Sequence, residues 1–242
     1  MIHYTNDEGF VTIFMCIFDF GGSHMLENYK TIYAGGEGEI TEKKSRFIAT
    51  VRLVEKEEDA LAFIEEMKKK YWDARHNCYA YSIGEHREFT RCSDDGEPSG
   101  TAGRPMLDVI LGADIYNVAV VVTRYFGGVL LGTGGLVRAY SGAVQAGLGE
   151  SVVIEKHHGI SLALTADYTA IGKLQYIAAE NQLPILDTEY TDKVIMHLLV
   201  PNDQVGRMEK VITEATSGRV KLEKEKELYF ADVDGEIKLF DH

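Results

Sequence analysis

Two glycine-rich segments carry the residue types in this sequence that are best suited to chemistry. Residues 94–103 and 126–135 each combine several glycines with polar side chains, and a helical pattern follows each of them. Glycine permits positive φ angles and a close approach of the backbone to a ligand. The first amide groups of a helix point toward one place, together with the positive end of the helix dipole. The two segments therefore predict a cleft that could hold an anion or an acidic group, without naming a ligand.

Polar side chains in and beside these segments complete a candidate binding cleft. Arginine suits bidentate contacts with phosphate, while histidine and carboxylate groups exchange protons. The candidate binding residues are His76, Asn77, Asp94, Asp95, Glu97, Ser99, Gly100, Arg104, Arg124, Gly127, Gly128, Gly134 and Gly135. Three further arginines lie near the segments, namely Arg75, Arg91 and Arg138. The sequence assigns no catalytic role to any of these residues.

The acidic residues of the first segment admit more than one interpretation. Asp94, Asp95 and Glu97 could hold Mg²⁺ through oxygen ligands. The same residue types are also typical of turns and caps, because aspartate followed by glycine favours a tight turn and Ser99 or Thr101 favours a helix cap. Both interpretations stay open at this level. Our expectation for the protein as a whole is that it binds no metal ion and no cofactor.

The cysteines predict neither a zinc site nor a cysteine nucleophile. His76, Cys78 and Cys92 lack a fourth ligand and the paired spacing of zinc sites. His76 and Cys78 lie two residues apart on one predicted strand, which does not supply the geometry of a thiolate polarised by a histidine. We expect Cys78 in the core and His76 at the cleft. The absence of a disulfide framework indicates a reducing compartment, so we expect a cytoplasmic protein.

Net charge and the first residues of the chain narrow the class of protein. The chain has 242 residues and a formal net charge of −13, which argues against a general nucleic-acid-coating surface but leaves room for a local basic cleft. The apolar run over residues 11–20 is too short to span a bilayer. Residues 22–25 then resemble an expression-vector scar. We interpret residues 1–24 as vector-derived, with a native membrane or partner anchor as the alternative.

Hydrophobic periodicity predicts two domains of mixed α and β structure. In the first, residues 25–150, strands are expected over 30–34, 37–41, 46–53, 76–83, 88–92 and 118–122, and helices over 56–71, 101–111 and 136–148. In the second, residues 151–242, strand, helix, strand, strand, helix and strand are expected over 159–165, 170–181, 185–190, 193–201, 204–216 and 220–229. That βαββαβ order is typical of the ferredoxin-like fold.

Four long strings of low degeneracy carry a resemblance to a known family. They are KSRFI at 44–48, DARHNCYAY at 73–81, SDDGEPSGTAG at 93–103 and the stretch 117–143. On these strings the chain from Met25 onward resembles the two-domain bacterial branch of the IMPACT/YigZ family. The resemblance implies an α+β protein, with an N-terminal domain similar to domain 2 of ribosomal protein S5 and a ferredoxin-like C-terminal domain. Together these are similar to neighbouring domains of the translocation factor EF-G, which implies an association with ribosomes or RNA.

The resemblance and the cleft together predict a non-enzymatic, translation-associated regulatory protein. We expect it to bind RNA, the ribosome or a translation factor through the glycine-rich cleft, and to have no membrane partner. The alternative is a hydrolase-like enzyme that acts on an anionic substrate in the same cleft, since acid, base and anion-holding groups are all present there. A third hypothesis is a protein-interaction module that docks a partner on its helix and strand faces. The sequence does not indicate the oligomeric state.

Overall fold

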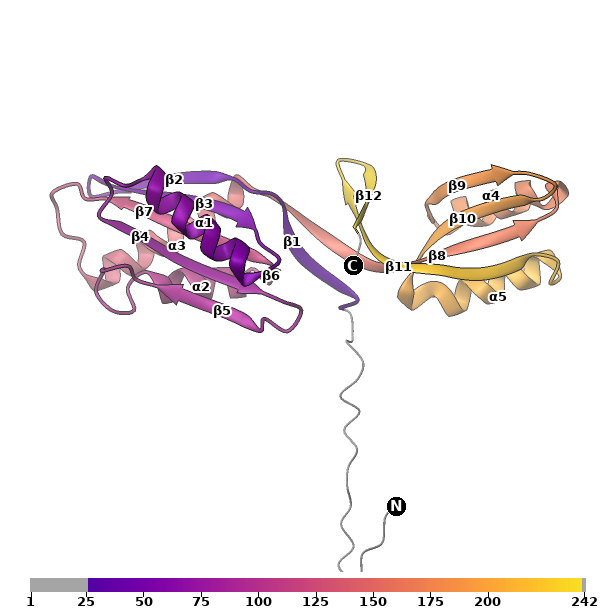
Figure 1. The fold of residues 1–242 in the computed structure, drawn as a ribbon, viewed down its shortest axis with the longest axis horizontal. Coiled ribbons are helices and arrows are strands. Elements are labelled where there is room, and N and C mark those ends of the chain that lie inside the picture. The colour runs from indigo at the N-terminus through magenta and orange to yellow at the C-terminus, as the bar shows by residue number, and fades with distance from the viewer. Residues whose placement is uncertain (1–25, 241–242) are drawn as a thin grey trace, which may run out of the picture.

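The computed structural model describes residues 26–240 and shows two lobes at the ends of an elongated molecule (Figure 1). The interpretation of residues 1–24 as vector-derived falls outside these described residues. Between residues 26 and 240, no helix is both long and apolar enough to cross a bilayer. The mixed α+β class with two domains, predicted from the sequence, is confirmed.

A five-stranded antiparallel sheet forms the centre of the N-terminal lobe. Its spatial order is β2 (Glu37–Glu42), β3 (Ser45–Leu53), β7 (Val118–Tyr125), β4 (His76–Ile83) and β5 (Phe89–Ser93). The predicted strand at 118–122 continues for three more residues, because Arg124 still pairs with Phe47 on one side and with His76 on the other. This extension places Arg124, two residues before the second glycine segment, beside His76 of β4.

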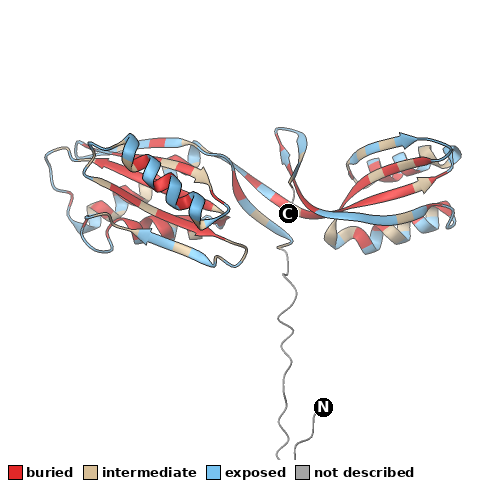
Figure 2. Cartoon of the chain, viewed as in Figure 1, coloured by how far each residue is buried: buried red, intermediate tan, exposed pale blue. Residues whose placement is uncertain are grey.

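Helices cover both faces of this sheet, which explains why β7 is apolar on both sides. Helix α1 (Glu57–Lys70) packs on the face that includes Ala119 and Val121. Helices α2 (Gly103–Gly112) and α3 (Thr133–Gly149) pack on the face that includes Val120 and Val122. Figure 2 shows buried residues continuing through the central strands, while α1 alternates buried and exposed positions as an amphipathic helix does.

Glycines allow α3 to lie close against the sheet. A Cβ atom on Gly38 of β2 would overlap the backbone of Ala146 and Gly147 in α3, although Gly38 itself has no unusual φ angle. A Cβ on Gly147 already lies 3.0 Å from the Cβ of Ala49 when it is built onto the backbone. Helix α3 also begins at Thr133, three residues before the predicted start, because Gly134 and Gly135 lie in its first turn and not in the preceding loop.

The C-terminal lobe has the predicted ferredoxin-like topology. Its elements follow as β8 (Val152–Ala166), η1 (Tyr168–Ala170), α4 (Ile171–Glu180), β9 (Ile185–Tyr190), β10 (Val194–Pro201), η2 (Asn202–Gln204), α5 (Val205–Thr216) and β11 (Lys221–Val233). The antiparallel order is β11, β8, β10 and β9, with the helices packed on one face. The predicted βαββαβ order is therefore confirmed.

Strand β8 is longer than predicted and belongs to both lobes. Its first residues pair with β1 (Asn28–Ala34), which also pairs in parallel with β6 (Ile115–Tyr116), and its last residues form the centre of the C-terminal sheet. Strand β12 (Glu236–Phe240) extends the sheet beside β11. The sequence predicted a strand only from residue 159. The predicted domain boundary at residue 150 falls between α3 and β8 and stays a prediction.

The close contact between β2 and α3 leads to a first prediction. Gly38→Ala should lower the free energy of unfolding by about 1–3 kcal/mol, because the new methyl group forces two backbones apart in a packed core. Urea denaturation of the full chain measures this change. Gly149→Ala is the matched control, since a Cβ at the last residue of α3 meets nothing within 4 Å. Equal stability of the two variants would contradict the prediction.

Candidate functional site

Asp94 organises the first glycine segment by accepting hydrogen bonds from backbone amides. Its Oδ2 accepts from the N–H of Gly100 at 2.8 Å, and its Oδ1 accepts from those of Ala102 and Gly103 at 2.9 and 2.8 Å. Partial burial raises the pKa of this carboxyl, but the three backbone donors outweigh burial and hold the pKa below its usual range. Because Ala102 is the N-cap residue of α2, Asp94 caps that helix from a distance.

The prediction that Ser99 or Thr101 caps the helix is therefore wrong. The hydroxyl of Thr101 donates instead to the carbonyl of Pro98, at 2.7 Å, and Ser99 lies exposed on the turn. The predicted tight turn is confirmed, because Asp95 and Gly96 have φ angles of 43° and 83° and the N–H of Glu97 donates to the carbonyl of Asp94. The side chain of Asp95 accepts from the N–H of Asn77 at 2.6 Å, which holds this turn against β4.

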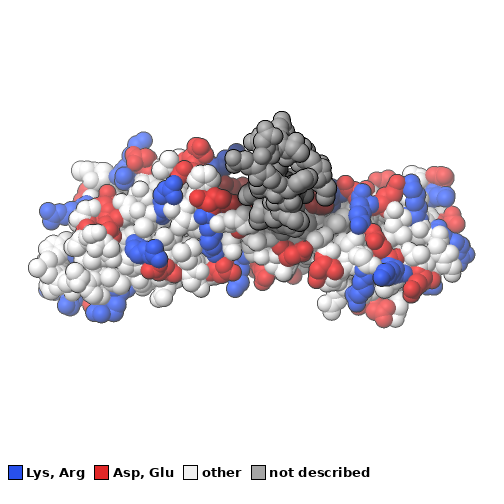
Figure 3. All heavy atoms as spheres, turned by 90° about the horizontal axis from the view of Figure 1, so that it is seen from below, with Lys and Arg blue, Asp and Glu red and all other residues white. Residues whose placement is uncertain are grey.

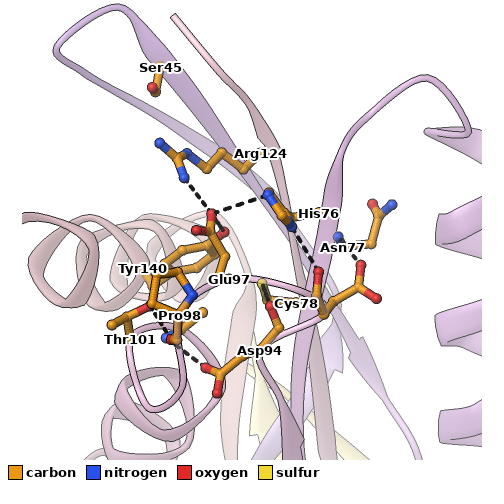
Figure 4. Close-up of polar contacts among 12 residues, drawn as sticks. Ser45, His76, Asn77, Cys78, Asp94, Glu97, Pro98, Thr101, Arg124 and Tyr140 are labelled. Carbon is orange, nitrogen blue, oxygen red and sulfur yellow. Dashed lines mark hydrogen bonds and ion pairs between the residues drawn. The ribbon is translucent and has the colours of Figure 1, made fainter. Parts of the chain in front are cut away.

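A buried carboxylate, that of Glu97, lies at the meeting point of the two glycine segments. Its Oε1 accepts from Arg124 Nη1 at 2.5 Å and from the hydroxyl of Tyr140 at 2.9 Å (Figure 4). Burial raises the pKa of Tyr140, so its hydroxyl keeps the proton that it donates. All three side chains are buried. The arrangement joins the first segment, β7 and α3 through one carboxylate.

His76 faces the same carboxylate from β4. Its Nδ1 lies 2.8 Å from the backbone carbonyl oxygen of Asp95, and its Nε2 lies 4.0 Å from Glu97 Oε1 (Figure 4). A carbonyl oxygen can only accept, so Nδ1 must carry a hydrogen. The other ring nitrogen, Nε2, is therefore the one left to contact a ligand in the cleft.

The magnesium interpretation of the first segment does not fit the geometry. The carboxylates of Asp94, Asp95 and Glu97 each accept from different donors and do not converge on one point. Within residues 26–240, no group of three histidine, cysteine, aspartate or glutamate side chains is arranged to hold a metal ion. Cys78 is buried as expected, its thiol donates to the carbonyl of Asp94 at 3.0 Å, and burial raises its pKa.

A cleft of about 440 Å³ opens beside Glu97 and reaches the start of α3. Polar side chains and backbone groups form one part of its lining, and apolar side chains form another. The lining residues are Arg75, His76, Glu97, Pro98, Arg124, Phe126, Leu130, Leu131, Gly132, Thr133 and Leu136. The structure thus brings His76, Glu97 and Arg124 together with the second glycine segment, as the sequence led us to expect.

The second glycine segment shapes the wall of the cleft through its backbone. Gly127 lies so close to the start of β3 that a Cβ would overlap the backbone of Lys44 and Ser45, and its N–H donates to the hydroxyl of Ser45 at 3.1 Å. Gly128 and Gly132 have positive φ angles of 83° and 72°, in which a larger residue would be strained. These positions fix the loop that leads from β7 into α3.

The amino end of α3 is open. Its N-cap, Gly132, has no side chain, and its first turn contains no acidic residue. By contrast, α1 begins with three acidic residues, and Asp94 occupies the first amides of α2. Gly132 and Thr133 at this helix start line the cleft, and no acidic side chain of residues 26–240 accepts a hydrogen bond from the first amides of α3 or offsets the positive end of its dipole.

Arg124 and Arg75 add cationic groups to the same cleft. The Arg124 guanidinium lies 5.3 Å from the ring centroid of Phe47 and 5.6 Å from that of Phe126. Its Nε is one of two buried side-chain nitrogen or oxygen atoms in the described chain that lack a hydrogen-bond partner. Arg75 is exposed and makes no ion pair with any described residue. Since the carboxylate of Glu97 neutralises Arg124, the net positive charge of the cleft comes from Arg75.

Several predicted site residues lie apart from the cleft. Arg104 is exposed on α2 and pairs with Asp108 at 2.8 Å. Gly100 lies on the exposed turn, and the side chain of Asn77 accepts from the buried hydroxyl of Thr123 at 2.7 Å. Tyr140, which contacts Glu97, was not predicted as a site residue. A tyrosine within the small-residue stripe of α3 was the available signal, because a buried hydroxyl requires a partner.

Comparisons with known proteins place this site within a described family. Residues 43–148 match the Impact N-terminal domain, and residues 164–219 match a domain of unknown function, DUF1949. The chain is 40% identical over 208 residues to the IMPACT family member YvyE of Bacillus subtilis, covering 86% of this chain and 95% of that protein. The chain belongs to the IMPACT family. All residues that line the cleft fall within the match to the Impact N-terminal domain.

Two further similarities agree with membership of the IMPACT family. The chain is 34% identical over 182 residues to the IMPACT family member YigZ of Escherichia coli, covering 74% of this chain and 89% of that protein. A crystal structure described as that of an hypothetical protein has a TM-score of 0.53 and 31% sequence identity, covering 84% of this chain and 99% of that one. The resemblance stated from the sequence is confirmed.

The buried pair of Glu97 and Arg124 leads to a prediction about stability. Glu97→Gln and Arg124→Met should each lower the free energy of unfolding by about 3–5 kcal/mol, because each leaves one buried group without its partner. The double variant should lose less than the sum of the two, since no unpaired charge remains. Urea denaturation measures all three. The exposed pair of Arg104 and Asp108 is the control, because removing either partner should lower the free energy of unfolding by less than about 1 kcal/mol. If the losses from Glu97→Gln and Arg124→Met simply add in the double variant, the two groups do not stabilise each other.

The Asp94 carboxylate leads to a prediction about pH. Its pKa in the folded chain lies below that in the unfolded chain, so the unfolded chain binds the proton more tightly. The stability that the carboxylate contributes is present at neutral pH and is lost as pH falls below about 4, through the folded pKa. Asp94→Asn should therefore cost stability at pH 7 and less at pH 3, measured by urea denaturation at both values. An equal cost at both values would rule out this contribution.

Proposed function

We propose that this IMPACT family member is a non-enzymatic, translation-associated regulatory protein that binds RNA phosphate, on the ribosome or free, through the cleft. The observation that carries the proposal is the open amino end of α3, which borders the same cleft as the unpaired Arg75. Backbone amides at a helix start together with arginine are the groups that hold phosphate in many proteins. The resemblance to domains of a translocation factor supports a setting in translation.

The distribution of charge favours local recognition over a broad electrostatic surface. Figure 3 shows acidic and basic side chains intermixed over the face that it presents, without a continuous basic area. The formal net charge of −13 opposes non-specific attraction to nucleic acid. Binding of phosphate must then depend on a few donors that are held in place, which is what the start of α3 and the arginines offer.

The hydrolase-like alternative has weaker support in the geometry of the cleft. A nucleophile requires an adjacent base that takes its proton. Ser99 is exposed on the turn and makes no hydrogen bond with a described side chain, while the thiol of Cys78 is buried and its pKa is raised by burial. The Oε1 of Glu97 already accepts from two donors. The residues are better arranged to hold an anion than to transform it.

Co-sedimentation with ribosomes across a salt series tests the proposal. Arg75→Gln should weaken binding several-fold and lower the slope of log affinity against log salt by about one, because one phosphate contact is lost. Arg104→Gln is the matched control, since this exposed arginine pairs with Asp108 on α2 and should leave binding unchanged. Both variants keep the buried groups of the cleft intact.

Three outcomes would overturn the proposal. One is an absence of binding at low salt, and another is binding that does not weaken as salt rises. The third is an equal effect of Arg75→Gln and Arg104→Gln, which would place the contact outside the cleft. Release of phosphate from a phosphate ester by the full chain, abolished by His76→Ala, would favour the hydrolase-like alternative instead.

A further inference from the structure

The cleft has an apolar wall that phosphate binding alone does not explain. Pro98, Phe126, Leu130, Leu131 and Leu136 line it together with the polar groups. Phe126 is 49% exposed and Leu130 is 82% exposed, so two of the large apolar side chains that line the cleft face solvent. Exposed apolar groups that gather beside a polar site are characteristic of a surface that contacts a ligand.

The wall is placed rigidly with respect to the cationic groups. Phe126 directly precedes Gly127, whose backbone is packed on β3 and whose N–H donates to Ser45. The ring of Phe126 also lies beside the Arg124 guanidinium, which is buried and paired with Glu97. The aromatic side chain therefore stands at a defined position beside the arginine, in the same cleft as the start of α3. Any ligand held by its anionic group at α3 would meet this wall with its other end.

We propose that the cleft takes one nucleotide of single-stranded RNA, with its phosphate at the first turn of α3 and Arg75 and its base against Phe126 and Leu130. This inference rests on the proposed function and names the form of RNA that the cleft accepts. Aromatic side chains next to cationic groups bind single strands because an unpaired base offers a face for stacking. Arg124 lines this cleft, and its buried Nε lacks a hydrogen-bond partner in the described chain.

A duplex would not satisfy the same cleft. In a double helix the bases are stacked on one another and only sugars, phosphates and base edges face outward. The apolar wall would then remain in water while the phosphate was bound. A volume of about 440 Å³ is within the range of small-ligand sites, and it accommodates a group the size of a nucleotide but not the width of a helix.

Fluorescence anisotropy with a labelled, unstructured RNA of a few nucleotides tests the inference on the full chain. We expect Phe126→Ala to weaken binding by about fivefold to a hundredfold, which corresponds to the loss of one stacked base. Phe126→Leu keeps an apolar contact but removes the aromatic face, so its affinity should lie between those of the unchanged protein and Phe126→Ala. Val129→Ala is the matched control, because Val129 is exposed in the same loop but does not line the cleft. A duplex of the same sequence should compete poorly, as should inorganic phosphate.

The results that would contradict the single-strand inference differ from those that would contradict the proposed phosphate-binding function. Equal competition by the duplex, or equal affinities of Phe126→Ala and Val129→Ala, would overturn the single-strand inference. If Arg75→Gln still weakens ribosome binding in that case, the phosphate-binding function stands without it. If Arg75→Gln and Phe126→Ala both leave RNA and ribosome binding unchanged, both proposals fail. Thermal unfolding of each variant verifies that it is folded, which is expected since Phe126 is half-exposed.

Discussion

The need of one buried carboxylate for its partners is the constraint on which the N-terminal lobe depends. Glu97 comes from the first glycine segment, while its donors Arg124 and Tyr140 come from β7 and α3. A buried carboxylate or guanidinium is tolerated only when paired and hydrogen-bonded. These three elements are therefore held together by electrostatics as well as by packing. The cleft exists where they meet, and its polar wall is in part the exposed edge of that buried cluster.

Most of the fold could be predicted because its signals are local. Strand β4 and strand β9 were predicted to the residue, since alternation and turn residues mark their ends. The first half of β8 was missed because Val152 to His158 lacks clean alternation and its partner, β1, lies more than a hundred residues earlier in the chain. The start of α3 was missed because Gly134 and Gly135 resemble a loop, whereas the first turn of a helix needs no hydrogen bond from its own amides.

The position of the candidate cleft could be predicted, but the contacts of each of its residues could not. The pattern of glycines in the sequence located both segments, and the chemistry of His76, Glu97 and Arg124 predicted that these side chains meet in one cleft. Asp94 caps a helix that begins nine residues later, which no local pattern reveals. Arg104 points outward because the face of a short helix that meets the core depends on which neighbours cover it. Features set by residues that are close in sequence could therefore be predicted, whereas the individual contacts with residues far along the chain could not.

The double membership of β8 has a consequence for dissecting the protein. A fragment that ended after α3 would retain β1 but lose the strand that satisfies most of its backbone hydrogen bonds, leaving only the two residues of β6 as a partner. A strand with a bare edge readily pairs with other chains. The amino-terminal half produced alone would therefore expose an unpaired strand edge that β8 covers in the whole chain. Self-association of such a fragment would report this missing strand and say nothing about the assembly of the intact molecule.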